Sequence, residues 1–106
     1  MSRQLDDLEV MLKQLIVEHE KLLRLMDLQH DAVRGLRIKS MEDLGSQHEA
    51  CRMRISGMES RRQALVQQIC ASARLTGKPT MSALAEAFPQ ARTVLMNLRE
   101  KLRNLA

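Results

Sequence analysis

Apolar residues recur at steps of three and four along the first third of the chain, which is the spacing of one face of an α-helix. The series runs without interruption until Gly35, and Met11, Ile16 and Leu23 widen it. It predicts one long amphipathic helix that ends at this glycine. The positions of this first seam are Leu5, Leu8, Leu12, Leu15, His19, Leu22, Met26, Gln29 and Val33.

A second seam of the same length follows a short polar segment. We expect its helix to begin at Ser40, because Asp43 three residues later resembles a capping box. Ser46, which follows Gly45 and precedes Glu49 by three residues, is the alternative start. The segment between the seams is long enough only for a turn, so the two helices should be antiparallel neighbours. The positions of the second seam are Met41, Leu44, His48, Cys51, Ile55, Met58, Arg62, Leu65 and Ile69.

The register of this hairpin follows from matching one seam to the other. If the numbers of opposed residues add to 77, every seam position meets another seam position. Met26 would then face Cys51, and Leu22 would face Ile55. Two helices still leave one flank of each apolar face in water, so a third element is required.

The segment that follows the second seam contains Gly-Lys, the dipeptide that ends a phosphate-binding loop. Such a loop also needs a glycine where Ser72 stands and a hydroxyl residue where Pro79 stands. We therefore interpret the segment as a corner, in which Gly77 ends the second helix and Thr80 or Ser82 caps a new one.

The third element is predicted to be a helix in two pieces. A short piece runs from about Thr80 to Phe88, and Pro89 breaks the helix. An apolar stripe then continues at steps of four and three. Its members are Ala91, Leu95, Leu98, Leu102 and Leu105.

Composition supports an all-helical fold. The chain has one Phe, no Tyr and no Trp, but eight Met, so residues that favour strands are scarce. The predicted fold class is all-α: a long antiparallel helical hairpin with a shorter, broken C-terminal helix that packs as a three-helix bundle. Residues 1–106 are expected to form a single helical domain.

Candidate chemistry is sparse. Cys51 and Cys70 lie roughly 28 Å apart along one predicted helix, which excludes a disulfide between them. The segment His-Glu-Lys-Leu-Leu at 19–23 begins like a zinc motif but lacks its second histidine. We expect no metal, no cofactor and no catalytic residue, and acidic side chains on solvated faces. The protein is therefore predicted not to be an enzyme.

The formal net charge is +4, and arginines concentrate on the second helix and near the C-terminus. Such stripes can contact phosphates, but no aromatic residues accompany them to stack on bases. We expect no nucleic-acid partner. No apolar run reaches the roughly 18 residues of a membrane span, and Arg3, Asp6 and Asp7 stand where a signal peptide would be apolar. A cytoplasmic location is predicted.

Three segments together resemble the FlgN-like flagellar export chaperones over nearly the whole chain. They are LEVMLKQLIVEHEKLLRLMDLQHDAV in the first helix, GMESRRQALVQQI in the second and TMSALAEAFP at the corner. The resemblance implies a chaperone that binds flagellar hook-associated proteins through their C-terminal amphipathic helix and delivers them to the flagellar type III export apparatus. It also implies that the C-terminal segment holds the client. The implied client-binding residues are Leu84, Phe88, Leu95, Leu98, Leu102 and Leu105.

Two alternatives stay open. The same leucines suit a coiled-coil scaffold or dimerisation protein without chaperone activity, and a homodimer is compatible with the seams. A basic helical protein that binds nucleic acid is the other alternative.

Overall fold

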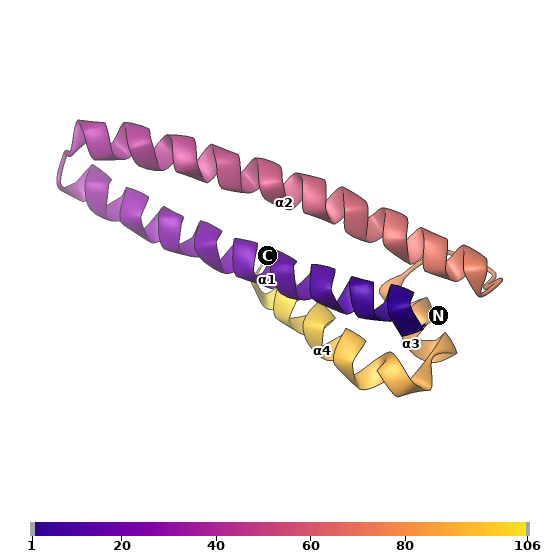
Figure 1. Ribbon diagram of the computed structural model, residues 1–106. Coiled ribbons are helices and arrows are strands. Elements are labelled where there is room, and N and C mark those ends of the chain that lie inside the picture. The colour runs from indigo at the N-terminus through magenta and orange to yellow at the C-terminus, as the bar shows by residue number, and fades with distance from the viewer. Residues whose placement is uncertain (1, 106) are drawn as a thin grey trace.

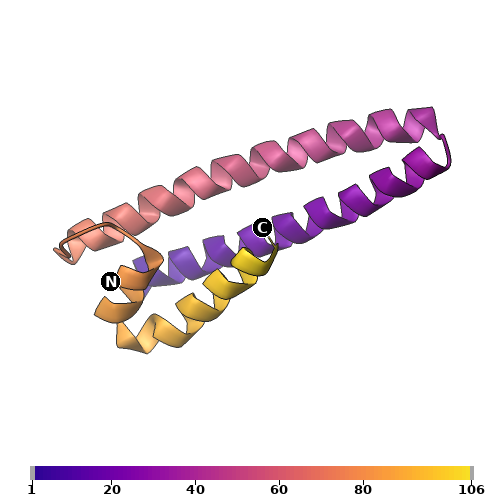
Figure 2. The ribbon, with the colours of Figure 1, turned by 180° about the vertical axis from the view of Figure 1, so that it is seen from behind.

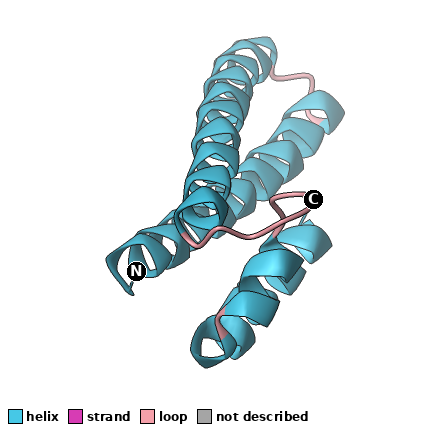
Figure 3. Ribbon diagram, turned by 90° about the vertical axis from the view of Figure 1, so that its right-hand side faces the viewer, coloured by secondary structure: helices cyan, strands magenta, loops and turns pink. Residues whose placement is uncertain are grey.

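The computed structural model describes residues 2–105, which form four helices. Helices α1 (Ser2–Arg34) and α2 (Ile38–Ser72) make a long antiparallel hairpin. The short α3 (Met81–Ala87) packs against α2, and α4 (Pro89–Leu105) returns alongside α1 (Figures 1 and 2). The described part of the chain contains no strand (Figure 3). The predicted fold class is confirmed. None of the described helices has the length and apolar character that a membrane crossing requires.

The three-helix bundle occupies only one half of an elongated molecule measuring 55 × 22 × 21 Å. Helix α4 lies along the N-terminal half of α1, and its last turn is next to the middle of α1 in both views (Figures 1 and 2). The other half is a two-helix hairpin. The main cluster of buried side chains accordingly lies in the covered half, and its members are Leu5, Leu8, Leu12, Ile16, Val66, Ile69, Cys70, Met81, Leu84, Leu95 and Leu98.

Burial along the first seam follows this division. Leu8, Leu12 and Leu15 are at most 1% exposed, whereas Met26 is 41% and Val33 is 53% exposed. In the uncovered half, α2 is the only neighbour of α1 among the described helices, so seam residues that do not point at α2 meet water. Near the end of α1 the fully buried side chain is Ala32. The seam therefore predicted a helix correctly but overestimated its buried length.

The predicted start of α2 is wrong. The helix begins at Ile38, because the carbonyl of Arg37 already accepts a hydrogen bond from the Met41 amide (2.9 Å). Ser40 lies within the first turn, and the helix continues through Gly45, so neither the favoured start nor the alternative is observed.

The early start also changes the register of the hairpin. The centre of the turn lies at residue 36, midway between the ends of α1 and α2, so opposed positions add to about 72. The predicted value of 77 is wrong. Cys51, which was expected to face Met26, instead donates a hydrogen bond to the backbone oxygen of Glu18 (3.4 Å), two turns nearer the start of α1.

Both long helices end in the same hydrogen-bonded motif. After α1, the Arg37 amide donates to Ala32 O and the Leu36 amide donates to Val33 O, and Leu36 takes a left-handed backbone conformation (φ 53°). This is a Schellman motif, in which the left-handed position is usually glycine. After α2, Arg74 (φ 57°) holds that position, so the predicted stop at Gly77 is wrong.

Leu36→Gly is expected to stabilise the protein by about 1 kcal/mol. A left-handed conformation costs an L-residue roughly 1 to 2 kcal/mol, part of which the added freedom of glycine in the unfolded chain offsets. Leu36 is 81% exposed, so little packing is lost. Ile38→Gly, two residues later in helical backbone, should destabilise by a similar amount. Urea unfolding measures the change in the free energy of unfolding for each variant. A change in the same direction in both variants would contradict the prediction.

The corner before α3 agrees with the sequence more closely. The Thr80 hydroxyl accepts a hydrogen bond from the Ala83 amide (3.1 Å) and caps α3, as predicted. Pro89 is the first residue of α4, a position at which the missing amide proton of proline costs nothing. Gly77 lies in the linker with φ 87°.

Candidate functional site

The six residues that the sequence singled out for client binding come together on one side of the bundle. Leu84, Leu95 and Leu98 belong to the buried core, and Phe88, Leu102 and Leu105 are half-buried against it. The spacing of the leucines on α4 places them on the face toward α1. These side chains are therefore engaged within the protein itself in this structure.

The leucine stripe of α4 passes from the interior to the surface along its length. Leu95 is 1% and Leu98 is 9% exposed, whereas Leu102 and Leu105 are only partly covered. The change occurs because the last turns of α4 approach the middle of the hairpin, where the described chain has no further helix (Figure 1). Another helix can thus reach the end of the stripe while α4 stays in place, but can reach Leu95 only if α4 leaves α1.

An open groove of about 510 Å³ lies where the end of α4 meets the hairpin. All four helices contribute to its apolar part. Its rim is basic, because Arg99 and Arg103 come from α4 and the nearby acid Glu59 is hydrogen-bonded to Arg62. We call it the end groove. Its lining residues are Leu12, His19, Ile55, Glu59, Arg62, Met81, Arg99, Leu102 and Arg103.

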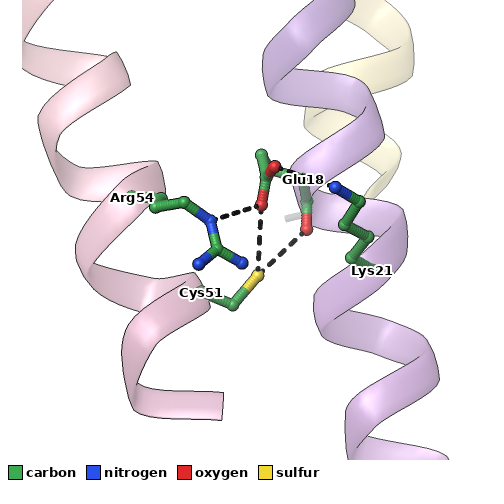
Figure 4. A network of polar contacts seen from close by, with 4 residues as sticks. All are labelled: Glu18, Lys21, Cys51 and Arg54. Carbon is green, nitrogen blue, oxygen red and sulfur yellow. Dashed lines mark hydrogen bonds and ion pairs between the residues drawn. The ribbon is translucent and has the colours of Figure 1, made fainter. Parts of the chain in front are cut away.

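A partly buried polar cluster joins the two long helices at the middle of α1 (Figure 4). The carboxylate of Glu18 accepts hydrogen bonds from Arg54 Nε (3.2 Å) and Lys21 Nζ (3.2 Å), and Cys51 Sγ lies 3.6 Å from its Oε2. Glu18 is 9% exposed and Cys51 is fully buried. Among residues 2–105, the contacts of Glu18 with Cys51 and Arg54 are the side-chain hydrogen bonds that join α1 to α2.

The cluster changes the acidity of its members. Burial by itself raises the pKa of the Glu18 carboxyl, but the hydrogen bonds from Arg54 and Lys21 and the charge of Arg54 outweigh it, so this pKa lies below its ordinary value. Burial, and then the hydrogen bond to Glu18, raise the pKa of the Cys51 thiol. Burial alone raises the pKa of the Cys70 thiol. Glu18 is thus held charged, and both cysteines are held as thiols.

The sequence interpretation missed Glu18, because acidic residues were assigned to solvated faces. A signal was present: Glu18 lies three residues after Leu15 and four before Leu22, and so on the seam side of the helix.

The sequence also predicted that the protein has no metal site. Within residues 2–105, no three His, Cys, Asp or Glu side chains gather closely enough to hold a metal ion.

Comparison with known proteins leaves the chain without a relative to guide the assignment. No family model matches it, and neither a curated protein nor a solved structure matches it. The family resemblance drawn from the sequence, and the function that it implies, therefore stay predictions.

Proposed function

We propose that the protein is a cytoplasmic export chaperone for flagellar hook-associated proteins. In this proposal, it holds the C-terminal amphipathic helix of a client against the leucines of α3 and α4, and it brings the client to the flagellar type III export apparatus. The sequence resemblance supplies the identity of the client and of the export apparatus. The arrangement of α4 on the hairpin supports the mode of binding.

The observation that carries the proposal is the incomplete packing of the α4 stripe. Leu102 lines the end groove together with Leu12 and Ile55, and this groove is open. An amphipathic helix laid into such a groove buries its apolar face there, which is the way in which grooves commonly hold helical segments. A client helix that is masked in this way cannot pair with other copies of the client before export.

The proposal is tested by titrating a fluorescently labelled peptide copy of a hook-associated C-terminus into the protein. Leu102→Ala combined with Leu105→Ala should weaken binding about thirtyfold, since truncating an apolar anchor commonly costs about 2 kcal/mol of binding free energy. Both residues are half-buried, so the melting temperature should fall only modestly.

Val94→Ala is the matched control, because Val94 is 40% exposed on α4 and does not line the end groove. Its peptide affinity should equal that of the wild type. Wild-type affinity in the double leucine variant would place the client elsewhere. If the double variant instead converts a homodimer to monomers in analytical ultracentrifugation and no peptide binds, the protein is a dimerisation scaffold.

A further inference from the structure

A second groove runs along the hairpin on the side of α1 away from α4. It consists of two hollows, of about 520 and 350 Å³. They follow one another along the same side of α1, and Glu18, which lines the first, pairs with Lys21 and Arg54, which line the second. We call it the outer groove. Its lining residues are Val10, Lys13, Gln14, Val17, Glu18, Lys21, Arg24, Leu25, Leu28, Gln47, Ala50, Arg54 and Met58.

Large apolar side chains lie exposed along this groove. Val10, Val17 and Leu28 are 53%, 48% and 51% exposed. Their separations of seven and eleven residues place them on one side of α1 over roughly 27 Å, a length that a helix of about 18 residues spans. A row of this kind, with apolar positions at helical spacing along a groove, fits the apolar face of another helix.

The outer groove is distinct from the surface that α4 occupies. Val17 is roughly 140° around α1 from Leu12, which packs in the core with the α4 leucines. No residue of α3 or α4 lines the outer groove. In Figure 4, α4 passes behind α1 at the level of the Glu18 cluster.

The outer groove is lined by more positive than negative charges. Four cationic side chains line it, and the carboxylate of Glu18 is its one acidic group. This carboxylate is shared between Lys21 and Arg54. Lys13 pairs with Glu9 (2.9 Å), and among residues 2–105 no ion pair holds Arg24. A bound segment therefore meets an excess of positive charge beside an apolar floor.

We infer that the outer groove binds an amphipathic helix of a partner protein whose apolar stripe is flanked by aspartates and glutamates. Opposite charges at the rim steer such a helix and fix its orientation, while the valines and leucines take its apolar side chains. A second copy of this chain is disfavoured, because two such grooves would place their cations together. Nucleic acid is disfavoured by the apolar floor and by the lack of aromatic side chains to stack on bases.

This inference does not depend on the proposed function, because the two surfaces share no residue. Two labelled 18-residue helical peptides test it. Both carry the same leucine stripe, flanked by glutamates in one and by lysines in the other. The acidic peptide should bind at least about tenfold more tightly, and Val17→Ser combined with Leu28→Ser should weaken its binding by about tenfold or more.

Two control variants separate the contributions to binding. Met53→Ser should leave the affinity unchanged, because Met53 is 67% exposed on α2 and lies outside the outer groove. Lys13→Glu combined with Arg24→Glu should reverse the preference between the two peptides, while Lys21 is left in place to pair with Glu18. Leu102→Ala with Leu105→Ala should leave the acidic peptide unaffected, which keeps this result separate from that of the end groove.

The inference is overturned if both peptides bind equally, if neither binds saturably at about millimolar concentration, or if the double serine variant binds like the wild type while a thermal melt shows it folded. Displacement of the acidic peptide by single-stranded DNA, with a steep salt dependence of the DNA affinity, would assign the groove to phosphates instead. Loss of a homodimer in the double serine variant would assign it to a second copy.

Discussion

Leu95→Ala is expected to lower the free energy of unfolding by about 3 to 4 kcal/mol and to release α4 from the hairpin. Leu95 is 1% exposed and belongs to the core, and its helix packs against α1 and α3. Truncation of a fully buried leucine costs about 2 to 5 kcal/mol, because the apolar contacts are lost and a cavity remains. The value should lie near the middle of this range, since Leu98 and the partly buried Leu102 and Leu105 also attach α4 to the core.

The matched control for this change is Leu23→Ala, which removes the same atoms from a side chain that is 42% exposed. It should cost less than about 1 kcal/mol. Urea unfolding monitored by circular dichroism gives both values. Equal losses in the two variants would mean that α4 is not docked on α1 in solution, and the described core would then be wrong.

Glu18→Ala is expected to cost about 2 kcal/mol at neutral pH. The substitution removes a buried carboxylate that accepts hydrogen bonds from Arg54 and Lys21, and hydrogen bonds to a charged group contribute about 1.5 to 3 kcal/mol. It also removes the Oε2 beside the Cys51 thiol. Glu20→Ala, on the exposed side of the same turn, should change stability by no more than about 0.5 kcal/mol.

The effect of Glu18 should depend on pH in a defined direction. The pKa of Glu18 is lower in the folded protein than in the unfolded chain. The stabilisation that Glu18 contributes is therefore fully present above the unfolded pKa and disappears as the pH falls through the folded pKa. The difference in the free energy of unfolding between the wild type and Glu18→Ala should therefore become smaller at acidic pH. A variant that is as stable as the wild type at neutral pH would mean that the desolvation of Glu18 cancels its ion pairs.

The starts of the two C-terminal helices were predicted well from the sequence, unlike the start and the end of α2. Thr80 was predicted to cap α3 and Pro89 to break the helix, and the structure places Thr80 at the cap of α3 and Pro89 at the start of α4. The helical stripes on α1 and α4 are local features, because the period of 3.6 residues is a property of the single helix. Leu8 was thus assigned to the core in advance, whereas Leu95 was expected to bind a client and is instead 1% exposed.

Features of the candidate sites that involve two helices were predicted poorly. A seam specifies which face of a helix is apolar, but not where along the axis the partner helix lies. That offset was set by three residues of turn, in which Leu36 adopts a left-handed conformation and α2 begins at Ile38. The burial of Glu18 depends in turn on the offset, since Cys51 and Arg54 come from the other helix.

The sequence by itself determined that this protein is helical, that it has two long helices and a broken third, and which side chains of each helix are apolar. Only the tertiary structure decided that α4 packs along half of α1, that its leucines Leu95 and Leu98 are interior while Leu102 opens into a groove, and that a basic apolar groove remains on the far side of the hairpin. The physical reason is that periodicity acts within one helix, whereas burial depends on which helices meet, at what offset, and over what length.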